Sequence, residues 1–132
     1  MASIHKARYD IICAESKLRK ESLEGIQSSD ERARSVWTNA LSVMEYIGQA
    51  KQQTEASSVA AYNKAILSRK QSIKDNMTKL GADEAFVATF LGFVDKQDTD
   101  NAMLQLMRLL IKRNPGLYRR QLAVCEAKVL QK

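Results

Sequence analysis

Apolar residues recur at steps of three and four along most of the chain, the spacing that places side chains on one face of an α-helix. A first helix is predicted over residues 4–23. A second begins near Ser28, because Ser28 and Glu31 match the spacing of a capping box. A third stripe, interrupted at Arg69, contains Val59, Tyr62, Ile66, Ile73, Met77 and Leu80.

The polar stretch from Gly48 to Ser58 leaves two interpretations open. Either the second helix stops there, with Thr54 or Ser57 capping the next, or one helix runs through residues 30–80. One uninterrupted helix would be about 75 Å long at 1.5 Å per residue, which is unusual for a compact domain. We therefore expect two helices, which can pair as one long helical hairpin.

Three further helices are expected in the remainder of the chain. Gly81 ends the third stripe, and a short aromatic-rich helix follows Asp83. Residues 98–100 then cap a helix over residues 101–113. Asn114 suits an N-cap and Pro115 the first helical position, so the chain turns directly into a last helix. The inward stripe of that helix is predicted to contain Tyr118, Leu122, Cys125 and Val129.

The helix over residues 101–113 is apolar around most of its circumference. Such a helix either lies at the centre of a core or lines a contact with another chain. The residues that would form a flexible docking surface are Met103, Leu106, Met107 and Leu110. The alternative is that these side chains simply fill the core.

Composition supports a single all-α domain over residues 1–132, built as a bundle of five or six helices. The chain has 132 residues, of which 45% are hydrophobic, a size and share that can bury a core. It has only five glycines and one proline, too few for a protein of many strands and tight turns. Trp37, the single tryptophan, is expected to anchor the core, with an exposed stacking platform as the alternative.

The length of the apolar runs and the polarity of the first residues indicate where in the cell the protein is expected. No apolar run approaches the roughly 18 residues of a membrane span, and the first ten residues are too polar for a signal peptide. Cys13 and Cys125 are expected to be reduced, buried thiols, with a bridge between them as the alternative. We expect a cytoplasmic protein, including the case of a viral or phage-encoded one, without membrane contact.

Candidate catalytic chemistry is sparse, so we expect no enzyme, no cofactor, no metal and no small-molecule substrate. The single histidine, His5, stands near the start of the chain, and no metalloprotease, hydrolase or phosphate-loop motif occurs. Asp95, Asp98 and Asp100 resemble part of a calcium loop but lack its glycine and its final glutamate. Helix capping accounts for these carboxylates more simply.

Charge is unevenly distributed. The net charge is +6, whereas residues 83–100 carry −4 and residues 101–132 carry +6. The candidate phosphate contacts are Arg108, Lys112, Arg113, Arg119 and Arg120. A second basic face contains Arg69, Lys70, Lys74 and Lys79. Tyr118 either stacks on a base beside these arginines or packs inward with its own helix stripe.

Clustered cations favour nucleic acid as a partner, because each cation that neutralises a phosphate releases condensed counterions. We therefore expect a small basic binding or assembly protein that contacts the backbone of RNA or DNA without reading bases. The alternative is a helix-docking adaptor or chaperone-like protein that uses the methionine and leucine face. Self-association is expected in either case, since the acidic and basic segments are complementary in charge.

Overall fold

The computed structural model of the chain describes Ile26 and residues 30–131. The described helices are α2 (Glu31–Lys51), α3 (Ala56–Lys79), α4 (Glu84–Asp95), α5 (Thr99–Arg113) and α6 (Pro115–Leu130). No strand occurs in this part of the chain, so the predicted all-α bundle is confirmed. The helix predicted over residues 4–23 lies outside the described residues.

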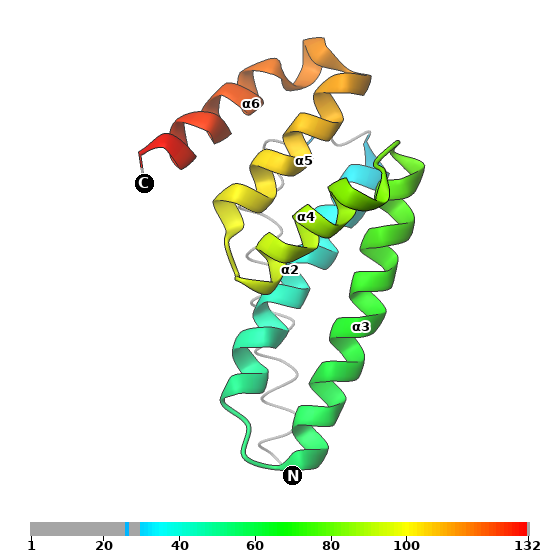
Figure 1. Ribbon diagram of the computed structural model, residues 1–132, viewed down its shortest axis with the longest axis vertical. Coiled ribbons are helices and arrows are strands. Elements are labelled where there is room, and N and C mark those ends of the chain that lie inside the picture. Colours follow the sequence, from blue (N-terminus) through cyan, green and yellow to red (C-terminus); the bar gives the residue numbers. More distant parts are fainter. Residues whose placement is uncertain (1–25, 27–29, 132) are drawn as a thin grey trace.

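Successive helices from α2 to α5 run in opposite directions (Figure 1). α2 and α3 form a long antiparallel hairpin, and α4 and α5 lie across its upper part (Figure 1). α6 then leaves the far end of α5 at an angle (Figure 1). The expected break between the second and third helices is confirmed, since residues 52–55 separate α2 from α3. Tyr46 and Tyr62 face each other across the hairpin, with ring centroids 6.0 Å apart.

Aspartates begin three of the five described helices. Asp30 accepts a hydrogen bond from Ala33 N at 3.4 Å, Asp83 from Phe86 N at 2.8 Å, and Asp98 from Asn101 N at 3.2 Å. Each carboxylate satisfies a backbone donor that the helix leaves unpaired. The predicted capping box is wrong in position, because α2 begins at Glu31 with Asp30 as its N-cap. Ser28 lies outside the described residues.

α3 begins without a side-chain cap and ends at a glycine. Its N-cap is Glu55, which makes no side-chain capping bond, so the expected caps at Thr54 or Ser57 are wrong. Its end follows the expected glycine stop: Gly81 has φ +99°, a backbone conformation that costs glycine little. Gly81 N donates to Thr78 O and Ala82 N to Met77 O, each at 3.0 Å, which satisfies carbonyls at the helix end.

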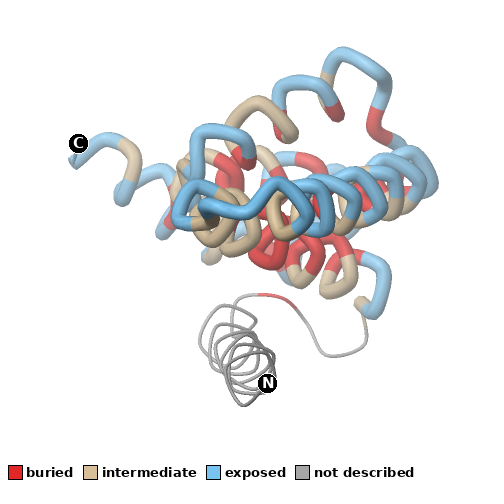
Figure 2. The backbone as a smooth tube through the Cα atoms, turned by 90° about the horizontal axis from the view of Figure 1, so that it is seen from below, coloured by how far each residue is buried: buried red, intermediate tan, exposed pale blue. Residues whose placement is uncertain are grey.

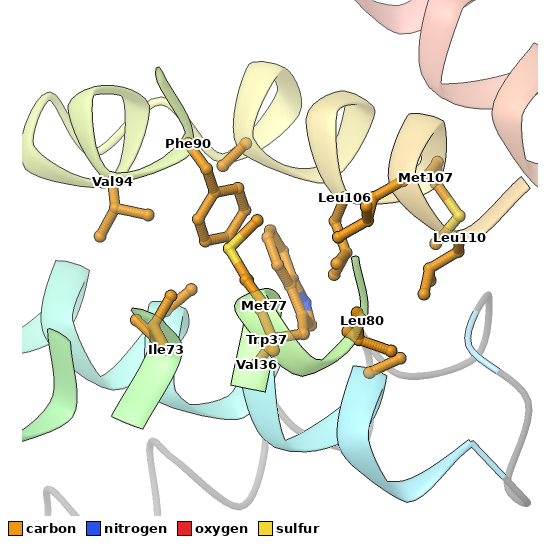
Figure 3. Packing of buried hydrophobic residues seen from close by; sticks show 14 of the residues in the cluster. Val36, Trp37, Ile73, Met77, Leu80, Phe90, Val94, Leu106, Met107 and Leu110 are labelled. Carbon is orange, nitrogen blue, oxygen red and sulfur yellow. The ribbon is translucent and has the colours of Figure 1, made fainter. Parts of the chain in front are cut away.

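The core forms where α4 and α5 meet the hairpin. Trp37 is 1% exposed, and its indole lies among Met77, Phe90 and Leu106 (Figure 3). The expectation that Trp37 anchors the core is therefore confirmed. Buried positions gather in the interior of the bundle, with exposed positions on its outer sides (Figure 2). α2 contributes buried residues from more than one side, so it is the central helix of the described part.

The turn between α4 and α5 is fastened to α2 by one glutamine. Gln97 has φ +58°, which is uncommon for a residue with a Cβ atom. Its Nε2 donates to Met44 O at 3.0 Å, and its Oε1 accepts from Lys51 Nζ at 3.4 Å. A Cβ atom at Gly48 would approach Gln97 Nε2 to 3.3 Å, so the glycine leaves room for this amide.

We expect Gln97→Ala to lower the free energy of unfolding by about 1–2 kcal/mol, because it removes two hydrogen bonds between the turn and α2. Alanine keeps the Cβ atom, so the backbone strain at this position stays the same. Urea denaturation measures the change. Gln71→Ala is the matched control, since Gln71 is exposed and bonds only Asp75 within its own helix. Equal losses in the two variants would contradict a fastening role for Gln97.

Candidate nucleic-acid interface

A single residue joins the two helices that carry the candidate phosphate contacts. Arg113 ends α5, Asn114 has φ −138° and ψ 71°, and Pro115 begins α6. The expected cap position and the expected first-turn proline are both confirmed. The Asn114 side chain makes no capping bond, however, and its backbone carbonyl accepts from Leu117 N at 3.1 Å instead. The chain therefore bends sharply at one residue.

We call the five candidate residues around this bend the basic corner. Its members are Arg108, Lys112, Arg113, Arg119 and Arg120, and all five are exposed. The sequence places no acidic residue between positions 101 and 125. The one ion pair within the described part of the chain joins Lys70 and Asp95, so no member of the corner pairs with a described acid. All five side chains are accessible to solvent.

The five cations are spread over both helices of the corner. Arg108 and Lys112 are four residues apart in α5 and lie on the same side of it. The guanidinium of Arg113 turns toward α3 and donates from Nη1 to Lys79 O at 3.3 Å. Arg119 and Arg120 are neighbours on α6 and point in directions about 100° apart. The structure thus brings Arg113 beside the carboxyl end of α3 rather than aligning all five side chains.

Tyr118 fixes the start of α6 to the start of α2. It is fully buried, and its hydroxyl donates to Asp30 Oδ2 at 2.7 Å. The inward-packing interpretation is confirmed, and base stacking by Tyr118 is wrong because no part of the ring is accessible. Through this bond the segment that carries Arg119 and Arg120 is held against the N-terminal end of α2.

The second basic face is partly engaged inside the protein. Arg69 donates from Nη1 to Asn39 Oδ1 at 3.0 Å, and Lys70 lies 2.6 Å from Asp95. These two side chains of the predicted basic face are each bound to another helix. Lys74 and Lys79 are exposed. The face is therefore reduced to two separate lysines.

A row of polar contacts between α2 and α3 was not anticipated from the sequence. It is defined here as the polar seam and contains Arg69, Asn39, Ser72, Asn76 and Arg32, linked in that order. Asn39 is 7% exposed, so its amide needs these partners. The available signal is a recurrence of Ser and Asn on otherwise apolar faces: Ser35, Asn39, Ser72 and Asn76 stand four apart in pairs.

The predicted docking surface on α5 is wrong for three of its four residues. Leu106, Met107 and Leu110 are each 0% exposed and belong to the core, and Met103 is partly buried against it. Their side chains cannot reach a partner because α5 packs on α2, α4 and α6. The core-filling interpretation is confirmed for the three buried residues. The large exposed apolar side chains among the described residues are Leu67, Leu117, Val124 and Leu130.

Cys125 is a free, buried thiol, as expected for a small hydrophobic residue. Burial raises its pKa, although the nearby positive charge of Lys128 opposes that shift. The thiol is therefore held in its neutral, less reactive form. Cys13 lies outside the described residues.

Two of the three acids that resemble part of a calcium loop have structural partners. Asp95 pairs with Lys70, and Asp98 caps α5. Within residues 30–131 no group of three or more histidine, cysteine or acidic side chains is placed to hold a metal ion. No helix in that range has the length and the apolar character needed to cross a bilayer.

Comparison with protein-family models, curated proteins and solved structures finds no significant match to this chain.

Proposed function

We propose that this protein is a non-enzymatic binding protein that contacts the phosphate backbone of nucleic acid through the basic corner. The observation that carries the proposal is the exposure of five cations in a stretch with no acid between them. Arginine suits such contacts because its planar group can donate two parallel hydrogen bonds to a phosphate. Tyr118 is buried, so the proposal involves the backbone and no stacking by this residue.

The orientation of Arg113 is compatible with this role. One of its nitrogens donates to Lys79 O, which leaves other donors of the same guanidinium directed elsewhere. The corner also sits where Lys112 and Arg113 offset the negative end of the α5 dipole. That stabilising role alone accounts for Lys112 and Arg113, but it does not account for Arg119 and Arg120 near the opposite, positive end of α6.

Binding should weaken steeply with salt. If four or five phosphates are neutralised, the affinity should fall roughly 100-fold or more between about 50 and 200 mM salt. Fluorescence anisotropy with a generic DNA duplex and a generic RNA duplex measures this. The double variant Arg119→Glu/Arg120→Glu should lose at least about tenfold in affinity at the lower salt, because two attractive contacts become repulsive.

Lys64→Glu/Lys96→Glu is the matched control for that variant. Both lysines are exposed, neither belongs to the corner, and the change in net charge is the same. It should bind much more tightly than the corner variant. Equal losses in the two variants would mean that only net charge matters, and no binding by the unaltered protein at about 50 mM salt would refute the proposal. Circular dichroism verifies that each variant is folded.

A further inference from the structure

α6 is the least covered of the described helices. Among those helices it packs on α5 alone, and in Figure 1 it stands at the edge of the bundle. Three of the four large apolar side chains exposed in the described part belong to it: Leu117 at 50%, Val124 at 42% and Leu130 at 84%. Exposed apolar side chains gathered on one element are typical of a surface that binds another protein.

Two of these residues share one side of α6 with two cations. Leu117, Arg120, Val124 and Lys128 follow at steps of three, four and four, and all four are exposed. We call this row the α6 strip. Interfaces commonly combine apolar contacts with arginine in this way. A partner of the strip should present apolar surface between negative charges.

α4 offers such a surface on the same chain. Glu84, Ala88, Leu91 and Asp95 follow at steps of four, three and four, and we call this row the α4 strip. Glu84, Ala88 and Asp95 are exposed, and Leu91 is partly exposed. Asp95 also pairs with Lys70, but its side chain remains 49% exposed. The α4 strip therefore places small or apolar residues between two acids.

The two strips match in length as well as in charge. At 1.5 Å per residue, Arg120 and Lys128 are about 12 Å apart along their helix, and Glu84 and Asp95 about 17 Å apart. Long, flexible lysine and arginine side chains can bridge that difference. An antiparallel arrangement would place Lys128 near Glu84 and Arg120 near Asp95, and it also opposes the two helix dipoles favourably.

We infer that the α6 strip of one molecule packs against the α4 strip of a second copy of this chain. The α6 strip is exposed, and all of the α4 strip except Leu91, which also packs against the core, is exposed, so the two can meet on neighbouring molecules. The contact uses different surfaces on the two partners, and such head-to-tail contacts continue from molecule to molecule unless a ring closes. The unaltered protein therefore self-associates into chains, or into rings where the chain closes on itself. This inference does not depend on nucleic-acid binding.

Complementary variants test the contact. Val124→Glu introduces an acid into the α6 strip and leaves the α4 strip intact, whereas Ala88→Glu does the reverse on α4. In sedimentation velocity from about 1 µM to about 1 mM, the unaltered protein should grow in mass with concentration. Each variant alone should stay monomeric. An equal mixture of the two should form a dimer that grows no further, since one intact strip of each kind remains.

Leu67→Glu is the matched control, because Leu67 is 68% exposed on α3 and lies outside both strips. It should associate like the unaltered protein. The inference is overturned if the mixture of variants stays monomeric, if the unaltered protein is monomeric throughout, or if Leu67→Glu also abolishes association. Thermal melting followed by circular dichroism verifies that both glutamate variants keep the fold, so that loss of association is not loss of structure.

Discussion

Trp37→Ala should lower the free energy of unfolding by about 3–5 kcal/mol, the range for deleting a large aromatic side chain from a core. Trp37 is 1% exposed and lies where α4 and α5 close over the hairpin, so its removal leaves a cavity lined by three helices. Since small domains are stable by only about 5–15 kcal/mol, this change removes a large part of the total. Urea denaturation at low temperature measures it.

Trp37→Phe should lower the free energy of unfolding distinctly less than Trp37→Ala does. The indole Nε1 of Trp37 is buried without a hydrogen-bond partner among the described residues. The indole therefore contributes through packing, and phenylalanine retains much of that packing while removing the unpaired donor. If Trp37→Ala were as stable as the unaltered protein within about 1 kcal/mol, the tryptophan would not be the centre of the core.

Tyr118→Phe should lower the free energy of unfolding by about 1.5–3 kcal/mol, the range for a hydrogen bond to a charged group. The change removes only the hydroxyl that donates to Asp30 Oδ2 at 2.7 Å. Asp30 also caps α2, so the start of that helix loses one of its supports. Thermal or urea unfolding monitored by circular dichroism gives the loss.

Tyr62→Phe is the control for the tyrosine experiment. Tyr62 is partly buried and contacts the ring of Tyr46, which phenylalanine preserves. Its loss of stability should therefore be smaller than that of Tyr118→Phe. Indistinguishable values would show that the bond between α6 and the start of α2 adds little to the fold.

Helix positions were readable from the sequence because their signals are local. Asp83, Asp98, Gly81 and Pro115 act on backbone groups within a few residues of themselves, and each stands at the helix end predicted for it. The predicted inward stripe of α6 also contains its two buried residues, Tyr118 and Cys125. Signals of this kind depend on spacing along one helix and need no knowledge of its neighbours.

The solvent exposure of individual side chains could not be predicted in the same way, because it depends on which other helix packs against them. The apolar circumference of α5 suited both a core helix and a docking helix, and only the packing of its neighbours distinguished the two. The sequence places Arg69 on a basic face, but it does not show that its guanidinium donates to Asn39, thirty residues away in the sequence. Leu117 and Val124 fell outside every predicted stripe, and their exposure emerged only with the fold.

The bond between Tyr118 and Asp30 joins positions 88 residues apart and sets the order in which the fold can be completed. A ribosome makes Asp30 early and Tyr118 late, and contacts so distant in sequence form only after a long loop has closed. The cap from Asp30 to Ala33 N needs only local sequence, whereas the bond from Tyr118 can form only after nearly all the described helices have emerged. Arg119 and Arg120 directly follow Tyr118, so the basic corner takes its place beside the start of α2 when that bond forms.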